Sequence, residues 1–264
     1  MACLTLLSDL GLQDASVASA KGILTGYLPE ATLIDISHEV EPFHLQQAAY
    51  LLSAAYPYFP QKTCHIVMCD IFSGNPPEML LCEKDDHYFL APDNGILSLA
   101  LGTRLENVWK CFEVGAGQSL KNWLHEVGKI SLQLQTTAAS ALGLQAHKIK
   151  NAPQHLKPKL DGNVVECHVI HIDRFENVVV NITKEQFETF GRNRPFIIQL
   201  IREDRITELS TSYTDVKEGE KLCRFNAAGY LEICINKGKA ASLLGLKLYR
   251  EQHLIYNTIK ISFQ

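Results

Sequence analysis

The chain has 264 residues, of which 46% are hydrophobic and 20% are charged. This composition is typical of a globular protein and excludes a disordered one, and the length allows one large domain or two. The formal net charge of −4, from 25 basic and 29 acidic residues, excludes a basic nucleic-acid-binding surface spread over the whole chain.

Apolar strands and amphipathic helices alternate at the start of the chain. The sequence predicts strands over residues 3–8, 31–37 and 63–70, with helices over 14–27 and 44–56 between them. Near-continuous apolar strands that alternate with helices are typical of a parallel sheet covered on both faces. We therefore predict an N-terminal α/β domain with a mostly parallel sheet.

The pattern changes after the third strand. A hairpin is predicted around Asp85-Asp86, a turn at Asp93-Asn94-Gly95 and a helix over residues 134–147. Two prolines and few apolar residues over 151–159 indicate a domain boundary. We therefore divide the chain into domains of residues 1–155 and 156–264.

The second domain is predicted to be a small β-barrel or sandwich, because most of its segments are strand-like and separated by Gly, Asp and Asn turns. Its strands are predicted over residues 163–172, 177–183, 195–201, 205–210, 221–226, 230–236 and 258–263, with a short helix at 240–244.

Eight cysteines occur without a CxxC pair, and most lie inside apolar runs. This placement favours small buried hydrophobic residues in a reducing compartment, and the spacings of known zinc modules are missing. For Cys3 and Cys111 a reactive thiol is the alternative. The N-terminus lacks a signal-peptide pattern, and no apolar stretch reaches the roughly 18 residues of a membrane span. We expect a cytoplasmic protein without a membrane partner or a bound metal.

Acidic residues follow two of the predicted strands, at Asp9 and Asp70. Asp35 lies within its strand, and Ser37-His38 reach the edge. Ligands of open parallel sheets bind beyond the carboxyl ends of the strands, where a carboxylate can accept hydrogen bonds from a ribose diol. Each aspartate could instead cap the following helix. Neither GxGxxG nor GxxxxGK[ST] occurs, so a ligand with hydroxyls and positive charge is favoured over a phosphorylated one.

Several segments along the chain match one family in order and spacing. They are residues 5–11 (TLLSDLG), Lys21-Gly22, 34–39 (IDISHE), 91–95 (APDNG), 172–177 (IDRFEN), Asn181, Tyr213, 229–233 (GYLEI) and Asn236. With these segments the sequence resembles the S-adenosyl-L-methionine hydroxide adenosyltransferases, the group that also contains the fluorinase and the chlorinase.

The resemblance implies an α/β N-terminal domain, a smaller β C-terminal domain and a homotrimer. It also implies that S-adenosylmethionine is the substrate, bound between the N-terminal domain of one subunit and the C-terminal domain of the next. No separate cofactor and no nucleic-acid partner is implied.

The resemblance also implies roles for individual residues. Asp9 matches the ribose-binding aspartate, and Asp173 matches the acid that holds the methionine amino group. Asn177 matches the residue that reads the adenine edge, and Tyr213 matches an aromatic placed against adenine. Asn236 falls where backbone groups approach adenine. Asn94 is a further candidate for substrate binding. A helix cap, β-turns or core packing are the structural alternatives.

The sequence departs from the family around the attacking water. Asp70 is the acid expected to position or deprotonate that water. Pro77 falls where the family has an arginine, and His125 is the nearest candidate for its histidine. Glu176 stands where the family has glycine, a substitution that costs about 1 kcal/mol if φ is positive there.

These observations leave three hypotheses. The first is hydrolysis of S-adenosylmethionine to adenosine and methionine by attack of water at the ribose C5′ atom. The second is a halide-dependent adenosyltransferase, for which the long inserted loop of the fluorinase is missing. The third is a binding protein without catalysis, which the missing arginine leaves open.

Overall fold

The computed structural model describes residues 3–72, 78–113, 119–200, 204–248 and 258–264. The chain forms two compact units, Met1–Ala152 and Pro153–Gln264. Within the described residues, no helix combines the length and the apolar character that crossing a membrane requires.

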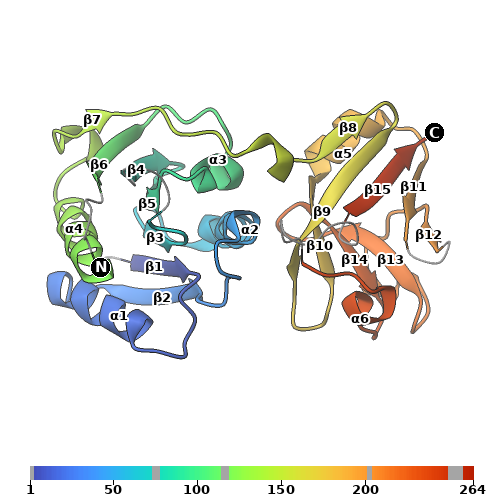
Figure 1. Cartoon of the computed structure of the whole chain (residues 1–264), viewed down its shortest axis with the longest axis horizontal. Helices are drawn as coiled ribbons and strands as arrows, with labels where there is room; N and C mark the ends of the chain where they lie inside the picture. The colour runs from blue at the N-terminus through green and yellow to red at the C-terminus, as the bar shows by residue number, and fades with distance from the viewer. Residues whose placement is uncertain (1–2, 73–77, 114–118, 201–203, 249–257) are drawn as a thin grey trace. The chain divides into compact units, whose positions relative to one another are not determined.

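The N-terminal unit is built on one seven-stranded sheet (Figure 1). Its strand order is β2-β1-β3-β5-β4-β6-β7. In that order the strands are Thr32–Ser37, Cys3–Ser8, Cys64–Met68, His87–Pro92, Glu78–Lys84, Val108–Glu113 and Gln145–Ala146.

This sheet is mixed, which corrects the prediction of a mostly parallel one. The pairs β2–β1, β1–β3 and β3–β5 are parallel. The pairs β5–β4, β4–β6 and β6–β7 are antiparallel. The reason is the predicted hairpin at Asp85-Asp86, which reverses the chain between β4 and β5. Both aspartates adopt positive φ angles, 52° and 61°.

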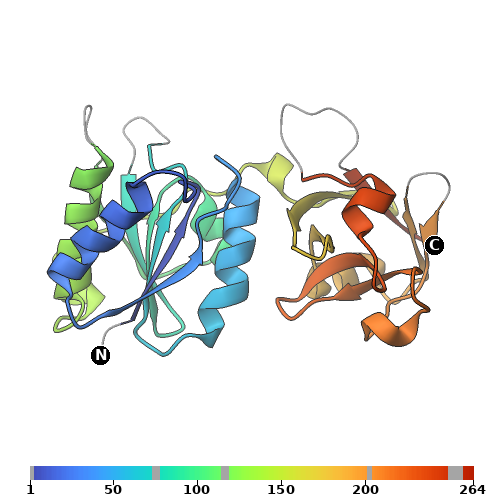
Figure 2. The same cartoon turned by 90° about the horizontal axis from the view of Figure 1, so that it is seen from below.

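Helices cover both faces of the sheet, as the alternating pattern predicted. Figure 2 shows α1 (Ser16–Tyr27) and α4 (Leu120–Gln133) on one side and α2 (Leu45–Ala55) on the other. The helix α3 (Ile96–Leu101) and the 3-10 turn η1 (Tyr56–Tyr58) accompany α2. Alternate residues of β1 serve the two cores, because Leu4 and Leu6 pack towards α1 and α4 while Leu7 packs towards α2.

The helix predicted over residues 134–147 is wrong. That segment holds only a 3-10 turn, η2 (Ala139–Ala141), and strand β7, and the helix is α4, which precedes it. Gly128 weakens the helical propensity of α4, but tertiary packing requires it. A Cβ atom added at Gly128 would lie 2.3 Å from Cδ2 of Tyr27.

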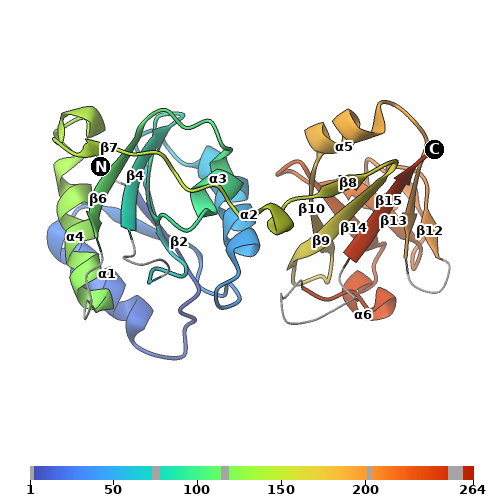
Figure 3. The same cartoon turned by 45° about the horizontal axis from the view of Figure 1, so that its top comes forward.

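The C-terminal unit is a nearly closed antiparallel barrel with strand order β12-β11-β15-β9-β10-β14-β13, and β8 pairs with β9. An isolated parallel bridge joins Leu209, just after β12, to Cys223 of β13 and so brings the two ends of the sheet together. Figure 3 shows α5 and α6 on opposite sides of the strands. From β8 to β15 the strands are Lys159–Asp161, Val164–Ile172, Val178–Thr183, Phe196–Gln199, Arg205–Ile206, Lys221–Phe225, Tyr230–Ile235 and Thr258–Phe263.

Helices α5 (Lys184–Gly191) and α6 (Ala240–Leu244), with the 3-10 turns η3 (Gln154–Leu156) and η5 (Tyr213–Asp215), complete this unit. The sequence predicted α6 and missed α5. The barrel core is aliphatic and aromatic, with Val180, Ile233 and Ile261 fully buried.

All eight cysteines are free thiols. Six are buried, and Cys3 and Cys111 are half-buried. Burial raises the pKa of the Cys111 thiol to about 12, which suppresses the nucleophilic thiolate.

Candidate functional site

Asp9 lies directly after β1, at the carboxyl edge of the parallel strands. Its Oδ2 atom accepts hydrogen bonds from the backbone N–H groups of Phe43, at 3.0 Å, and Asp70, at 3.2 Å. One carboxylate oxygen therefore ties together the segments that follow β1, β2 and β3. Asp9 does not cap α1, because that helix begins at Ser16 and has no side-chain cap.

The other carboxylate oxygen of Asp9, Oδ1, is available to a ligand. Outside the gaps in the described chain, no residue donates a hydrogen bond to Oδ1. The Asp9 side chain is only partly buried. A carboxylate held at one oxygen and open at the other can accept a hydroxyl donor from a ligand.

Asp70 follows β3 and shares this edge with Asp9. It adopts a left-handed backbone, with φ of 50°, which aspartate tolerates better than most residues. Two carboxylates at one edge create a negative field. Burial first, and then the charges of Asp9 and Asp70, raise the pKa of the neighbouring Cys69 thiol. Such a field favours a cationic ligand.

Asn94 supports the end of β3. Its side-chain amide donates to the carbonyl of Cys69, at 3.1 Å, and more weakly to that of Asp70, at 3.4 Å. Its Oδ1 accepts the N–H of Ile96 at the start of α3. The side chain thus holds two segments of the carboxyl edge together, and contact of Asn94 with substrate stays a prediction.

His125 lies on α4 and meets Tyr27, the last residue of α1. The Tyr27 hydroxyl and His125 Nδ1 are 3.1 Å apart, and the rings pack edge to face. A helix of 12 residues is about 18 Å long, and α1 runs from the carboxyl edge back towards the start of β2. His125 therefore packs at the end of α1 that lies away from this edge, and its catalytic role beside Asp70 stays a prediction.

In the C-terminal unit, Asp173 and Asn177 form one turn between β9 and β10. Asp173 Oδ1 accepts the N–H groups of Phe175, at 2.9 Å, and Asn177, at 2.8 Å. Its Oδ2 accepts the Asn177 side-chain amide at 3.0 Å. The structure brings the two predicted residues together, but much of their hydrogen-bonding capacity serves the turn itself.

Glu176 has a φ angle of 64°. A positive φ is strained for glutamate, and the resemblance places a glycine at this position. Glu176 also compensates for that strain. Its carbonyl accepts the N–H of Ala241, its Oε2 accepts the N–H of Ser242, and Oε1 pairs with Lys239 at 3.0 Å. The side chain thus caps the N-terminus of α6 from another segment.

Tyr213 lies in η5 and contacts Glu232 and Arg224; the sequence motifs do not include Arg224 and include Glu232 only within the segment 229–233. Its hydroxyl donates to Glu232 at 3.1 Å, and the Arg224 guanidinium lies 4.6 Å from the ring centroid. Burial, followed by the charge of Glu232, raises the pKa of Tyr213 to about 12. Glu232 and Arg224 face each other across β14 and β13, and Glu232 is only 4% exposed. The sequence signal that could have found this cluster was a charged residue, Glu232, inside the otherwise apolar run YLEICI.

The Tyr213 cluster also borders the Asp173 turn. Burial first, then Glu232 and more weakly Asp173, raises the pKa of the Cys234 thiol, so both acids lie near one sulfur atom. Asn236 lies two residues further along, and its side-chain amide donates to the carbonyl of Val216 at 2.8 Å. The predicted C-terminal residues therefore gather around the end of β14.

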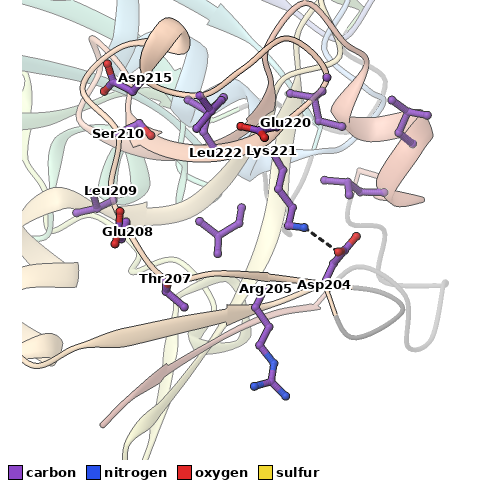
Figure 4. A pocket seen from close by; sticks show the side chains of 16 residues that line it. Asp204, Arg205, Thr207, Glu208, Leu209, Ser210, Asp215, Glu220, Lys221 and Leu222 are labelled. Carbon is purple, nitrogen blue, oxygen red and sulfur yellow. Dashed lines mark hydrogen bonds and ion pairs between the residues drawn. The ribbon is translucent and has the colours of Figure 1, made fainter.

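A cavity of about 820 Å³ lies elsewhere on the barrel, beside β12 and β13. Figure 4 shows the Lys221–Asp204 ion pair on one side of it and Asp215 with Ser210 on the other. None of the predicted site residues lines this cavity. Its size therefore does not identify it as the functional site.

One group of side chains has ligand types that suit a metal ion: Glu78, Asp93 and His147. Their ligand atoms lie within 4.8 Å of one another. Lys110 contacts Glu78 at 2.7 Å, and the Lys150 ammonium lies 3.6 Å from both acids. These two cations already neutralise the carboxylates, so we interpret the group as an ion-pair network that holds the turn after β5.

Two family models match the chain. The SAM hydroxide adenosyltransferase N-terminal domain matches residues 4–128, and the SAM hydroxide adenosyltransferase C-terminal domain matches residues 167–252. The chain belongs to this family. The resemblance inferred from the sequence motifs is confirmed.

Among the relatives of this chain, two named hydrolases are more similar to it than a named fluorinase is. The chain is 27% identical to the (R)-S-adenosyl-L-methionine hydrolase of Methanocaldococcus jannaschii, over 96% of this chain and 95% of the relative. It is 26% identical to the hydrolase of the same name from Salinispora tropica, covering 92% and 94%. A fluorinase of Actinopolyspora mzabensis is more distant, at 21%, with the same coverage.

The fold matches a crystal structure of an uncharacterized conserved protein from Thermotoga maritima. The TM-score is 0.79 at 25% identity, and the match covers 98% of this chain and 99% of the other. Pro77, which the resemblance places at the position of the family arginine, lies outside the described residues.

Proposed function

We propose that this protein hydrolyses S-adenosyl-L-methionine to adenosine and L-methionine. Full-length similarity to proteins named as S-adenosylmethionine hydrolases supports this reaction over halide transfer, because the fluorinases are more distant. The observation that carries the proposal is the carboxyl edge of the N-terminal sheet. There Asp9 presents an open oxygen beside Asp70, in a negative field that suits a sulfonium ion.

The reaction needs little covalent chemistry from the protein. A water oxygen forms a bond to the ribose C5′ atom, and the C5′–sulfur bond breaks with its electron pair going to sulfur. Adenosine, methionine and one proton result. The sulfonium is already an activated leaving group, so the protein supplies orientation of the water and acceptance of its proton.

Asp9 is assigned to the ribose diol and Asp70 to the attacking water. Asp173 is assigned to binding the methionine ammonium. Asn177 and Tyr213 are assigned to contacts with adenine. For Asp173 the arrangement leaves room, because a carboxylate has about four acceptor positions and the turn uses three.

The remaining assignments follow the family resemblance. Asn236 is placed near adenine through its backbone and Asn94 beside the substrate. The resemblance offers His125 as an auxiliary to Asp70, but its contact with Tyr27 at the far end of α1 gives that role no support. A cytoplasmic homotrimer with S-adenosylmethionine shared between subunits belongs to the same proposal, as does the division into residues 1–155 and 156–264.

Chromatography of the pure protein incubated with S-adenosylmethionine tests the reaction. Release of adenosine and methionine in halide-free buffer is the expected result. A product that forms only when halide is added would support the hypothesis of a halide-dependent adenosyltransferase instead. Binding without any product over a day would leave a binding protein, for which the missing arginine would be the reason.

The variant Asp70→Asn tests the role of Asp70 with little disturbance, because asparagine also tolerates a left-handed backbone. Removing a general base lowers turnover by roughly 10²–10⁴-fold. Asp86→Asn is the matched control, since Asp86 has a φ angle of 61° and lies in the β4–β5 turn at the opposite edge of the sheet. Turnover that is equal in the two variants would remove Asp70 from the mechanism.

A further inference from the structure

Four residues from three of the family-matching segments form a continuous polar chain beside the site. The Ser8 hydroxyl and His38 Nδ1 are 2.6 Å apart. His38 Nε2 lies 3.1 Å from Asp35 Oδ1, a close contact without full hydrogen-bond alignment. The Lys21 ammonium donates to the other oxygen of Asp35 at 2.6 Å. The chain links α1, β2 and the end of β1.

The inner half of this chain is buried and the outer half is exposed. Ser8 and His38 are 0% and 3% exposed, whereas the side chains of Asp35 and Lys21 are 38% and 37% exposed. A buried pair joined at 2.6 Å is a rigid contact, because breaking it would leave two buried polar groups without each other.

His38 holds the turn that carries Asp9 from both sides. Its ring contacts Ser8, the residue before Asp9, and its backbone carbonyl accepts the N–H of Gly11 at 2.9 Å. Ser8 Oγ also lies 3.4 Å from the N–H of Leu10. The segment that begins at His38 continues to Phe43, whose N–H donates to Asp9 Oδ2. His38 therefore fixes the turn that carries Asp9 and begins the segment that supplies the second partner of that contact.

The Ser–His–Asp order does not make Ser8 a nucleophile. In a nucleophilic triad the serine faces Nε2 and the acid faces Nδ1, whereas here the two nitrogens are exchanged. Ser8 is also fully buried, so a substrate atom cannot approach its hydroxyl. The neutral tautomer with its proton on Nε2 lets the Ser8 hydroxyl donate to Nδ1 and leaves the Nε2 proton facing Asp35.

We propose that His38 is a positioning residue that orients Asp9 towards a ribose diol and so makes the site selective for nucleosides with both hydroxyls. This inference rests on the proposed function, in which Asp9 contacts the ribose. It adds that the selectivity depends on a buried histidine that does not touch the ligand.

Calorimetric affinities for adenosine and for 2′,3′-dideoxyadenosine test the inference. We expect the full-length wild-type protein to bind adenosine about 10-fold or more tightly than the dideoxynucleoside, since a charge-assisted hydrogen bond is lost with the hydroxyls. In His38→Ala that ratio should fall to about 3-fold or less, with the affinity for the dideoxynucleoside unchanged. Asp9→Asn should lower the ratio equally.

Two further variants separate positioning from a general loss of structure. His38→Asn keeps an acceptor that the Ser8 hydroxyl can reach, so it should restore most of the ratio. Ser8→Ala deletes one hydroxyl and should lower the ratio as His38→Ala does, which decides the question even if His38→Ala does not fold.

The inference is overturned if Ser8→Ala and the folded His38 variants keep the wild-type ratio, or if both nucleosides lose affinity together. Those outcomes leave the proposed function intact. Wild-type protein that binds neither adenosine nor S-adenosylmethionine would instead overturn the proposed function and the inference with it.

Discussion

Asp9 and Asp173 are both aspartates that the family resemblance assigns to the substrate, but their surroundings differ. Asp9 is bonded by two neighbouring segments at one oxygen, and its other oxygen is open within the described structure. Asp173 accepts three hydrogen bonds at two oxygens, all from its own turn. Asp9 therefore joins parts of the sheet that are distant in sequence, whereas Asp173 organises a local loop.

This difference shows how a residue predicted to bind substrate can also stabilise the fold. The cost of changing Asp9 should appear mainly in ligand binding, because its structural partners need one oxygen. The cost of changing Asp173 should appear in both binding and stability, because the turn needs both oxygens. Three predictions examine the comparison.

Asp173→Asn is expected to have the largest effect. Loss of the charge facing the methionine ammonium should weaken S-adenosylmethionine binding by about 1.5–3 kcal/mol, and one lost hydrogen bond in the turn should lower the free energy of unfolding by about 1 kcal/mol. Adenosine affinity should stay unchanged, since adenosine lacks the ammonium. Calorimetry and urea denaturation measure the two parts.

Asp161→Asn is the control for that variant, because Asp161 is an exposed aspartate of the same unit. It should change neither quantity. If Asp173→Asn alters stability alone, Asp173 serves only the turn, and the comparison with Asp9 becomes one between a ligand residue and a structural residue.

The stability of the N-terminal unit should depend on pH, because this unit buries the histidine pair His65 and His87. Thr5 Oγ1 lies 2.7 Å from His65 Nδ1, and His65 Nε2 lies 3.2 Å from His87 Nδ1. Burial, followed by the charge of His87, lowers the pKa of His65 from 6.5 to about 3. The unfolded chain therefore binds more protons between these values, so stability is complete above pH 6.5 and is lost as the pH falls towards 3.

At pH 5 this one group should lower the free energy of unfolding by about 2 kcal/mol relative to pH 7. Urea denaturation at the two pH values measures the loss, and His65→Gln should reduce it because the amide does not titrate. An equal pH dependence in the wild type and in His65→Gln would show that other groups dominate the acid response.

Glu176 provides the smallest expected effect, within the same turn as Asp173. Glu176→Ala removes the cap of α6 and keeps the strained backbone, so it should cost about 1 kcal/mol of unfolding free energy. Glu176→Gly also loses the cap but relieves the strain, so it should be more stable than the alanine variant by about 1 kcal/mol.

Urea midpoints of the two Glu176 variants check this difference. Lys239→Ala, which removes only the exposed ion pair, should change stability by less than about 0.5 kcal/mol. A glycine variant no more stable than the alanine variant would contradict the account of strain at this position.

Local patterns in the sequence were sufficient for most strands and for the first two helices, but they did not predict β6, β7 or β8. Runs such as residues 3–8 and 63–70 are apolar on both faces, and this property belongs to the residues themselves. Local patterns did not predict α4. Its Gly128 leaves space for the ring of Tyr27, and this contact across 101 residues cannot be seen in a local pattern. The mixed sheet likewise depended on which strand β4 pairs with.

The candidate site divides in the same way. The sequence by itself determined which acids end the strands, and its motifs determined the family. Only the tertiary structure decided that Asp9 meets Phe43 and Asp70, that Asp173 is occupied by its own turn, and that His38 reaches Ser8. A hydrogen bond depends on distances and directions between side chains, and these are set when strands distant in the sequence pack into one sheet.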